Sequence, residues 1–474
     1  MSSPYHIFST RDNEYIYSTL SNDIVLIDDL TSKIINSIFR ENKQFGQTID
    51  ALKKDHNLEN IVNSCSLVKK LTSNKIISEN NKINLLKPEL PKKPYSSTLV
   101  IGLTEQCNFR CLYCSYSGNY LGQREHSNLK IDLDTSLDTI NQLADMQNQK
   151  IHIGFYGGEP LIEYKKIRDI VAYSKKKFDK TTYSITTNAS LLKKDKISFL
   201  IDNDFITVIS LDGPKNMHDK WRRTISNDET FEKIIPKLEL IKDLNSEYYE
   251  KKVGFNCVLT PPYEFFKIEE FFNTELFKKN QVNFIQVNMY DSKLKFKELD
   301  ENSSRQLEIL KEKYIQDLIE NRPEERPKIV SSIYEKPIKQ IFDRVKNPLL
   351  KFPINGPCLP GIHKLYLNSS GIYQICERSV QTLSIGDIRN GIDFKKSDKI
   401  LSDYHDFVRD KCKDCWSSRL CGLCEVSPLK NNVYDKERLD EQCDIMRNTL
   451  HNSLIMYARV IEKNPNAFIS LFKQ

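Results

Sequence analysis

Hydrophobic and polar positions follow two alternating patterns over the central part of the chain. Short apolar runs rich in β-branched residues predict strands at 98–103, 151–155, 183–187, 205–210, 253–259 and 282–288. Between these runs, apolar residues recur with helical spacing at about 134–147, 163–178, 193–202, 229–244 and 264–277. Strands that alternate with helices are typical of a parallel sheet, and six such units can close partly into a barrel. We therefore predict an α/β fold with a partial (β/α)6 barrel over 97–290.

The preceding residues predict a separate α+β unit over 1–86, similar to a winged helix. Alternating residues at 14–19 and 23–27 predict a hairpin that turns at Ser21-Asn22. Helical patterns follow at about 30–40, 47–56 and 58–73, and strand-like pieces at 75–78 and 82–86. Residues 87–94 contain three prolines, which interrupt helices and sheets, so we place a linker there.

The remaining residues predict a helical connection and then a cysteine-rich region. The connection covers 291–351 and is interrupted at Pro323 and Pro327. The region 352–474 begins with an alternating stretch at 365–375 around a turn at 368–371, which predicts a hairpin. It ends with an amphipathic helical pattern at 439–463. A chain of 474 residues is long enough for about three domains.

Charge and hydropathy restrict the partners that we expect. The net charge is +6, from 70 basic and 64 acidic residues, and so small an excess gives no case for a nucleic-acid partner. No run of about 18 apolar residues is present, so we expect no membrane span. The first 30 residues lack a basic segment followed by an apolar one, and we therefore expect a cytoplasmic protein.

Twelve cysteines are the strongest chemical signal in the chain. Disulfides are a poor explanation in a reducing cytosol, and clustered cysteines there are typical of metal ligands or redox groups. Ten of the twelve fall into two groups. Cys65 and Cys257 stand apart, and we expect both to be buried structural thiols.

The first group is Cys107, Cys111 and Cys114, directly after the first predicted barrel strand. Thiolates suit iron–sulfur clusters and zinc. A closed site takes four ligands, and no nearby histidine or cysteine completes this set, so a four-iron cluster would keep one open iron. A zinc site remains the alternative. Polar and glycine-rich segments also follow the next three strands, and parallel strands would bring them to one face.

With Tyr113 before its last cysteine, this C-x3-C-x2-C run resembles the signature of the radical S-adenosylmethionine (SAM) superfamily. The segment at 157–160 resembles the GGEP segment of that family, and 218–222 resembles its H-D-x-x-R continuation. The resemblance implies that the open iron binds SAM. By the same resemblance, the cofactor-binding residues are Tyr113, Gly157, Gly158, Glu159, Pro160, Thr187, Asn188, Ser210, Asp212 and Arg222. Loop capping and surface pairing remain the alternative for Asp212, His218 and Arg222.

The second group holds seven cysteines, more than any single tetrahedral site can use. Its spacing resembles the SPASM domain of peptide-modifying radical SAM enzymes, which implies two auxiliary [4Fe-4S] clusters and three in all. Two zinc ions are the alternative. By resemblance, the ligands of the outer cluster are Cys412, Cys415, Cys421 and Cys443, and those of the inner cluster are Cys358, Cys376 and Cys424.

Two departures from the SPASM pattern concern the inner cluster. Only two residues separate Cys421 from Cys424, where the family usually has three. Phe352 stands where many members have a further cysteine. We therefore expect an open iron, filled by a substrate group or by the remote Cys65 or Cys257.

Glu377 directly follows Cys376, and in some relatives an acid at this position acts as a base. The resemblance makes Glu377 a candidate catalytic proton acceptor, with a surface salt bridge as the alternative.

Residues 1–86 resemble the small leader-recognition domains of enzymes that modify ribosomally made peptides. We therefore expect a peptide maturase that installs a thioether or carbon–carbon crosslink in a precursor peptide, with a flavodoxin or ferredoxin as reductant. One alternative is an anaerobic sulfatase-maturing type of enzyme, which forms formylglycine. Another is a non-catalytic iron–sulfur protein that binds peptides or carries electrons.

Overall fold

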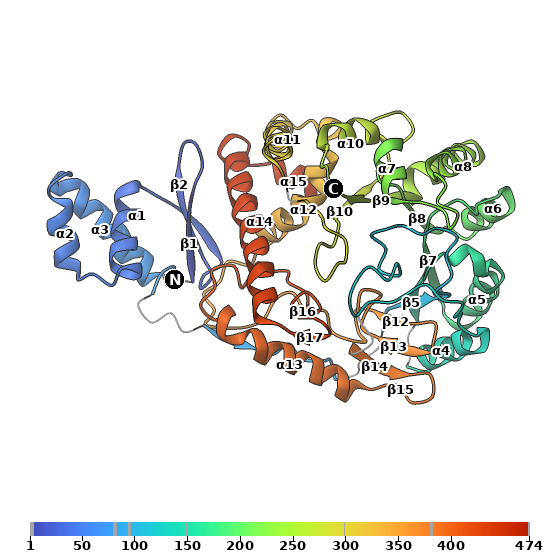
Figure 1. Cartoon of the computed structure of the whole chain (residues 1–474). Coiled ribbons are helices and arrows are strands. Elements are labelled where there is room, and N and C mark those ends of the chain that lie inside the picture. The colour runs from blue at the N-terminus through green and yellow to red at the C-terminus, as the bar shows by residue number, and fades with distance from the viewer. Residues whose placement is uncertain are drawn as a thin grey trace.

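A computed structural model describes residues 4–78, 83–92, 96–146, 149–297, 299–379 and 383–472. Its largest element is a ten-stranded sheet in the order β10-β9-β8-β7-β6-β5-β12-β13-β14-β15 (Figure 1). The first six of these strands are parallel: β5 (Thr98–Gly102), β6 (Lys150–Tyr156), β7 (Lys180–Thr187), β8 (Ile206–Ser210), β9 (Val253–Leu259) and β10 (Val282–Gln286). All six predicted barrel strands are confirmed. In the described residues β10 pairs only with β9, so the barrel is partial.

Helices connect the parallel strands and cover one side of the sheet (Figure 1). The predicted helices are confirmed as α4 (Leu133–Asp145), α5 (Tyr164–Lys177), α6 (Lys194–Asp202), α8 (Phe231–Leu244) and α10 (Phe265–Phe272), with 3-10 helix η2 (Pro160–Glu163) before α5. Two short helices were not predicted, α7 (Lys215–Trp221) and α9 (Ser246–Lys252). Seven residues are too few for an apolar period to stand out.

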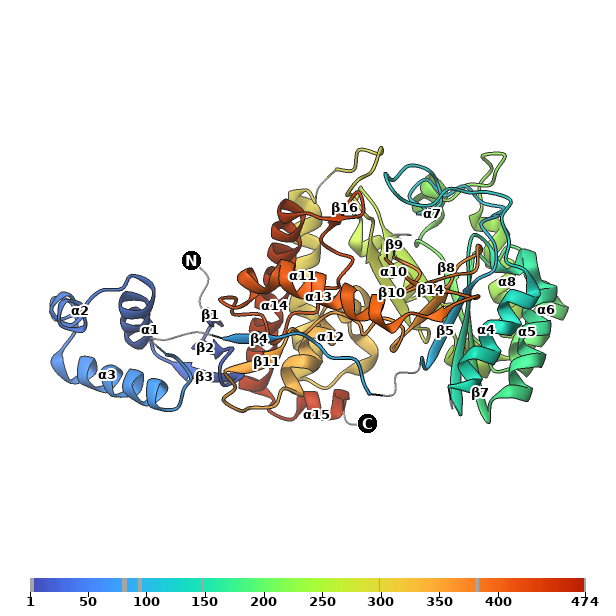
Figure 2. The same cartoon turned by 90° about the horizontal axis from the view of Figure 1, so that it is seen from below.

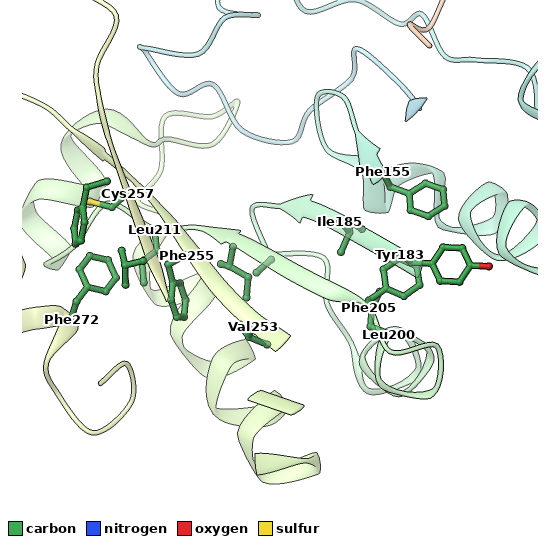
Figure 3. Packing of buried hydrophobic residues seen from close by; sticks show 14 of the residues in the cluster. Phe155, Tyr183, Ile185, Leu200, Phe205, Leu211, Val253, Phe255, Cys257 and Phe272 are labelled. Atoms are coloured by element: carbon green, nitrogen blue, oxygen red, sulfur yellow. The ribbon is translucent and has the colours of Figure 1, made fainter. Parts of the chain in front are cut away.

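Buried aromatic and aliphatic side chains fill the space between sheet and helices (Figure 3). Phe205 stacks on Phe155 and Tyr183, with ring centroids 5.9 and 5.2 Å apart. Cys257 is completely buried, and Figure 3 shows it close to Phe272 in this core. The expectation of a buried structural thiol at this position agrees with that placement.

The N-terminal residues form a small α+β unit at one end of the molecule (Figure 2). Its antiparallel sheet has the order β1 (Tyr5–Ser9), β2 (Glu14–Ser18) and β3 (Asp23–Ile27). The predicted hairpin is β2–β3, and β1 was not predicted. Four helical segments follow: α1 (Asp29–Ile35), the π-helical η1 (Asn36–Arg40), α2 (Phe45–Leu52) and α3 (Leu58–Ser73).

The chain after α3 differs from the prediction. Residues 75–78 form turns and bends, so the strand predicted there is wrong. β4 (Asn84–Leu86) is a strand, but it pairs in parallel with β11 (Lys351–Pro353) and not with the N-terminal sheet. Residues 93–94 of the predicted linker lie outside the described residues. The partner of β4 is more than 250 residues away in sequence, so no local pattern could indicate this pairing.

Helices and short strands make up the rest of the chain. The helical connection is α11 (Glu301–Ile319), η3 (Pro323–Glu325) and α12 (Lys328–Phe342). The last region contains β12 (Leu365–Leu367), β13 (Ile372–Gln374), β14 (Ser384–Asp387), β15 (Gly391–Ile392), α13 (Phe394–Cys412), β16 (Leu429–Lys430), β17 (Val433–Tyr434), α14 (Lys436–Lys463) and α15 (Ala467–Phe472). The predicted hairpin at 365–375 is confirmed as β12–β13. β12 also pairs in parallel with β5, so the cysteine-rich region extends the barrel sheet.

The N-terminal sheet packs against the cysteine-rich region. The ring of His6 in β1 stacks on Trp416, with centroids 4.1 Å apart, and His6 Nε2 lies 2.9 Å from Nδ1 of His451 in α14. The hydroxyl of Thr19 donates to the carbonyl of Trp416. Two neighbouring imidazoles and an aromatic ring therefore form this contact. None of the helices in the described part of the chain combines the length and apolar composition needed to span a bilayer.

We expect His6 to make this contact sensitive to acid. Burial, and then the nearby His451, lower the pKa of His6 from 6.5 to about 3. In the unfolded chain His6 takes up a proton as the pH falls below about 6.5, whereas in the folded chain it stays neutral. The stabilisation is therefore complete above that pH and decreases from there toward about pH 3.

The measurement is the unfolding midpoint of the full chain at about pH 7 and about pH 5. The wild type loses stability between these two pH values, and His6→Asn is expected to remove about 2 kcal/mol of that loss. His56→Asn changes a histidine outside this contact and is the control. An unchanged pH dependence in His6→Asn would contradict the assignment.

Candidate functional site

The first cysteine group lies in the loop that follows β5. Backbone N–H groups of Phe109 and Tyr116 lie 3.4 Å from the Sγ atoms of Cys107 and Cys114, respectively. Neighbouring thiols of the group help to raise the pKa of Cys107 and Cys111, so the three side chains lie near one another. Burial raises the pKa of Cys107 to about 12, so a bound metal would be needed to hold it as a thiolate.

Two backbone hydrogen bonds fix this loop against the segment after α7. The N–H of Arg110 donates to the carbonyl of Arg223 at 2.7 Å, and that of Leu112 donates to Trp221 at 2.9 Å. The cysteine loop and the segment that resembles H-D-x-x-R are therefore held side by side.

Gly157 and Gly158 bring the turn after β6 against the backbone that leads into the cysteine loop. A Cβ atom on Gly157 would lie 2.4 Å from the carbonyl oxygen of Thr104, and one on Gly158 would lie 2.1 Å from that of Gln106. Gly157 also has φ +139°, a conformation that favours glycine. The N–H of Gly158 donates to Thr104 at 2.6 Å. In the described contacts, these glycines permit a close approach of two protein segments.

Glu159 joins this turn to the end of β7. Its carboxylate accepts hydrogen bonds from the Thr187 hydroxyl at 2.7 Å, the Asn188 N–H at 2.8 Å and the Leu161 N–H at 3.0 Å. The side chain is 1% exposed. By resemblance Glu159 is a cofactor-binding residue, and in the described residues protein donors engage both of its carboxylate oxygens. Its observed role is to position the turn, which leaves the backbone polar groups of the turn for a ligand.

Asn188 connects the end of β7 with the cysteine loop. Its Nδ2 donates to Oδ1 of Asn108 at 2.9 Å and lies 3.9 Å from Sγ of Cys107. Thr187 is occupied by Glu159. Asn188 is therefore the residue at this strand end that reaches the cysteine site.

A buried network links the cysteine loop to the end of β8. The hydroxyl of Tyr113 donates to Oδ2 of Asp212 and accepts from Nη1 of Arg222 at 2.8 Å. Oδ1 of Asp212 accepts from the Val258 N–H at 3.1 Å. Each residue of this network comes from a different strand end or loop, so the network holds these segments together.

Arg222 has an unused hydrogen-bond donor, which is suited to an anionic ligand. It is 7% exposed, and its Nε is buried without a hydrogen-bond partner in the described residues. Burial opposes its charge, but Cys111, Tyr113 and Asp212 together raise its pKa well above the usual range of an arginine. A permanent buried cation with a free N–H, next to three thiols, fits a site for an iron–sulfur cluster and a carboxylate-bearing cofactor.

His218 and Asp219 hold this part of the chain in shape. Nδ1 of His218 accepts from the Asp212 N–H at 3.2 Å, and Nε2 lies 3.1 Å from the Thr230 hydroxyl, which itself donates to the carbonyl of Arg222. This pattern makes His218 a neutral imidazole with its proton on Nε2. Burial lowers its pKa well below 6.5. Oδ1 of Asp219 accepts from the N–H groups of Thr230 and Phe231 at the start of α8. Capping therefore describes His218 and Asp219, whereas Arg222 faces the site.

Two further predicted residues lie at the edge of the site. Pro160 is buried and begins η2, where a missing N–H has no cost. Ser210 ends β8 and is half-buried. Neither side chain makes a described hydrogen bond to the residues of the cysteine loop.

Four cysteines of the second group surround one small cavity. Cys412, Cys415, Cys421 and Cys443 all line it, together with apolar residues such as Leu85 and Tyr404. Burial and the other three cysteines raise the pKa of Cys412. Burial raises the pKa of Cys421 to about 12. A closed four-thiolate set in an apolar cavity fits a cluster whose irons all have protein ligands. This is the set that the SPASM resemblance assigned to the outer cluster.

The other three cysteines lie near one another in a second place. Cys376 contributes to a raised pKa of the Cys424 thiol. Glu377 contributes in the same way to the raised pKa of Cys358 and of Cys376. Gly356 brings the Cys358 segment against Leu423, because a Cβ there would lie 2.4 Å from the Leu423 carbonyl.

Sequence reasoning missed Glu425, which lies among these three cysteines. It is 1% exposed, and Oε2 of its carboxylate accepts from the Cys358 N–H at 3.1 Å and lies 3.4 Å from Sγ of Cys424. The available signal was an acidic residue directly after a cysteine, as at Glu377.

Cys65 and Cys257 pack against other parts of the protein than the inner set of cysteines. Cys65 is only partly buried, against the core of the N-terminal unit, so the expectation of a buried thiol is wrong there. Cys257 is buried in the barrel core near Asp212. Neither thiol makes a described contact with Cys358, Cys376 or Cys424. Phe352, at the position of the missing cysteine, is buried under Arg419.

Glu377 forms a two-point ion pair. Both of its carboxylate oxygens accept from Nζ of Lys364 at 3.0 Å. Its charge also contributes to the raised pKa of Tyr156, and so does the nearby Cys114. A salt bridge is the role that the structure displays for Glu377.

No three His, Cys, Asp or Glu side chains in the described ranges converge closely enough to hold a single metal ion. In a cubane cluster each thiolate meets a different iron, so its ligands lie farther apart than those of one zinc ion.

The loops at the carboxyl ends of these parallel strands bring together three thiols, a glycine turn and a buried cation. Residues 101–273 match the radical SAM superfamily, and the chain therefore carries a radical SAM domain. That family implies a [4Fe-4S] cluster and SAM.

Curated relatives are similar over the same part of the chain. A cysteine-type anaerobic sulfatase-maturating enzyme of Clostridium novyi is 30% identical over 183 residues, which are 37% of this chain and 49% of the relative. The radical SAM cyclopropyl synthase TigE of Paramaledivibacter caminithermalis is 25% identical over 169 residues, 33% of this chain and 34% of the relative. The chain thus spans about half or less of the length of these relatives.

A solved structure confirms the fold over a longer range. The structure titled native anSMEcpe with bound AdoMet and Cp18Cys peptide matches with a TM-score of 0.54 and 19% identity. It covers 79% of this chain and 98% of that chain. About a fifth of this chain therefore has no counterpart in a protein that is itself almost completely matched.

We expect Arg222→Lys to weaken SAM binding about 10- to 100-fold, because a charge-assisted hydrogen bond contributes about 1.5–3 kcal/mol. The lysine keeps the charge but lacks the Nε–H group. Equilibrium dialysis with labelled SAM measures the affinity of the reconstituted protein, and iron analysis verifies an unchanged cluster content. Arg223→Lys, at the neighbouring position, is the control. Wild-type affinity in Arg222→Lys would refute the role.

Iron content tests the two auxiliary sets. Three complete clusters correspond to about twelve irons per chain, and Cys412→Ala is expected to lower this by up to about four. Cys424→Ala is expected to cause a similar loss from the inner set. Cys65→Ala should retain all iron, since Cys65 packs in the N-terminal core. Zinc in place of iron in anaerobically prepared protein would exclude the cluster assignment.

Proposed function

We propose that the chain is a radical SAM peptide maturase. It cleaves SAM reductively and removes hydrogen from a ribosomally made precursor peptide, which leads to a thioether or carbon–carbon crosslink. The supporting observation is that one sheet joins a radical SAM site to two further sets of cysteines, and that an N-terminal sheet packs on the same region.

The residues around the first cysteine group would hold and orient the cofactors. When bound, the cluster and SAM supply a carbon radical that can remove an unactivated hydrogen atom. Cys107, Cys111 and Cys114 would hold the cluster, and Nε of Arg222 would bind the SAM carboxylate. Backbone groups of the glycine turn and the Asn188 side chain would complete the site.

A cavity of about 440 Å³ offers a place for the modified part of the peptide. It lies between the end of β10 and the segments that directly follow the inner cysteines, and Tyr290, Arg378 and Val426 are among its lining residues. A substrate there would lie between the barrel and the inner cluster. That position suits the transfer of an electron from a substrate radical to an auxiliary cluster.

The N-terminal sheet offers a place for the leader part of the peptide. β3 pairs only with β2 in the described sheet, so its outer edge has free backbone groups. Leu26 on β3 and Leu58 and Val62 on α3 are more than half exposed. An extended peptide that adds to this edge would gain backbone hydrogen bonds and cover apolar side chains nearby.

Glu377 is our candidate proton acceptor for this reaction. It adjoins the inner cysteine set, and Lys364 holds its carboxylate in a fixed orientation. A purely structural salt bridge is the alternative, and full turnover by Glu377→Gln would favour it.

Formation of formylglycine in a sulfatase is the second candidate function. The 30% identity to a sulfatase-maturating enzyme favours it. The departures at the inner cysteine set, the free β3 edge and the unmatched fifth of the chain favour the peptide crosslink. A non-catalytic electron carrier is a third reading, against which the complete set of SAM-site residues argues.

The test is co-expression with the small open reading frames next to the gene, followed by mass spectrometry of the peptides. We expect one peptide to lose two hydrogens at a mapped residue pair. Cys107→Ala should leave it unmodified, whereas Cys65→Ala should modify it fully.

Oxidation of a single cysteine or serine to an aldehyde would instead establish the sulfatase type of reaction. Anaerobic assay with dithionite covers the remaining reading, because a carrier protein would not cleave SAM. A flavodoxin or ferredoxin is the reductant that we expect in the cell, and the same assay accepts either in place of dithionite.

A further inference from the structure

Glu425 is a buried carboxylate without a cation. In the described part of the chain, no Lys, Arg or His lies within ion-pair distance of it, and its side chain is 1% exposed. An unpaired carboxylate in a protein interior costs several kcal/mol unless a positive charge or several donors compensate it. The described groups that act on its carboxylate are the Cys358 N–H, its own backbone N–H, the Cys424 thiol and the more distant His363.

Glu377 provides an internal comparison. Both acids directly follow a cysteine of the inner set, Cys376 or Cys424. Glu377 is neutralised by Lys364 through two contacts of 3.0 Å. Glu425 has no such partner and turns back toward Cys424, so the two acids are used differently.

We propose that Glu425 is the fourth protein ligand of the inner iron–sulfur cluster, with a carboxylate oxygen on the iron that Cys358, Cys376 and Cys424 leave open. This inference rests on the proposed auxiliary cluster. A bound iron supplies the missing positive charge and accepts an oxygen donor. The Glu425 carboxylate and the Cys424 thiol lie 3.4 Å apart, so the side chains of these two successive residues point in the same direction.

The local sequence and packing agree with this assignment. Cys421 is separated from Cys424 by two residues and from Glu425 by three, and three is the spacing at which the SPASM resemblance leads us to expect a ligand. Gly356 lets the Cys358 segment meet this stretch backbone to backbone. The Glu425 carboxylate joins the two segments through the Cys358 N–H.

Other groups of the chain are poorly placed for this role. Cys65 packs against the N-terminal core and Cys257 lies in the barrel core, and neither makes a described contact with the inner cysteines. Phe352 offers no donor atom. The assignment also implies that the inner cluster is complete before any peptide binds, so a peptide thiolate is not needed to hold it.

The experiment uses the full-length chain with Cys107, Cys111 and Cys114 replaced by Ala, which leaves only the auxiliary clusters. Iron and sulfide are measured after anaerobic reconstitution, together with Mössbauer and electron paramagnetic resonance spectra. Glu425→Gln is expected to lose about one iron per chain, as a cluster of four irons becomes one of three. Glu425→Cys should keep all iron, with a spectrum of all-thiolate ligation. Glu377→Gln is the matched control and should keep both iron and spectrum.

Unchanged iron and an unchanged Mössbauer spectrum in Glu425→Gln would overturn the assignment, and so would a shifted reduction potential with all iron retained, which indicates a hydrogen bond to Cys424. Loss of the whole inner cluster in both Glu425→Gln and Glu425→Cys would also overturn it, since that outcome indicates a structural role. Absence of the inner cluster itself is recognised separately: replacing Cys358, Cys376 and Cys424 by Ala would then leave the iron content of this chain unchanged.

Discussion

The close backbone contact at Gly157 and Gly158 is the constraint on which the site depends. Any side chain at either position would collide with a carbonyl of residues 104–106. Because the contact is backbone to backbone, it fixes the start of the cysteine loop relative to β6 without depending on a rotamer. Glu159 then extends this order to the end of β7 through three hydrogen bonds.

Much of the fold could be predicted because barrel strands and long helices carry strong local patterns. The parallel strands are rich in apolar or β-branched residues, and α3 matches its predicted bounds of 58–73. The errors lie where tertiary contacts decide. β4 looks like an edge of the N-terminal unit in sequence, but it pairs with β11. The segment 75–78 has apolar residues because Ile76 and Ile77 pack in a core, and burial alone does not make a strand.

The candidate site shows the same division. Residue types and spacing identified both cysteine groups, the glycine turn and Arg222, because cluster chemistry restricts the ligands strongly. The role of Glu159 could not be predicted, since a carboxylate near a cofactor site can face either the ligand or the protein. Glu425 was missed for a related reason. Its burial and its lack of a cation are properties of the folded chain, and nothing in the letters CGLCEV distinguishes it from an exposed acid.

One continuous sheet connects the two cysteine regions, since β12 pairs with β5. Arg124 adds a second link, because it donates to the hydroxyls of Tyr116 and Tyr366 and to the carbonyl of Ser379. A hinge between these regions would have to break a strand ladder. Their separation is therefore a fixed length, set by hydrogen-bond register. If both regions hold redox centres, the fixed distance between them sets the rate of electron exchange. A substrate that binds between them must fit a gap of constant width.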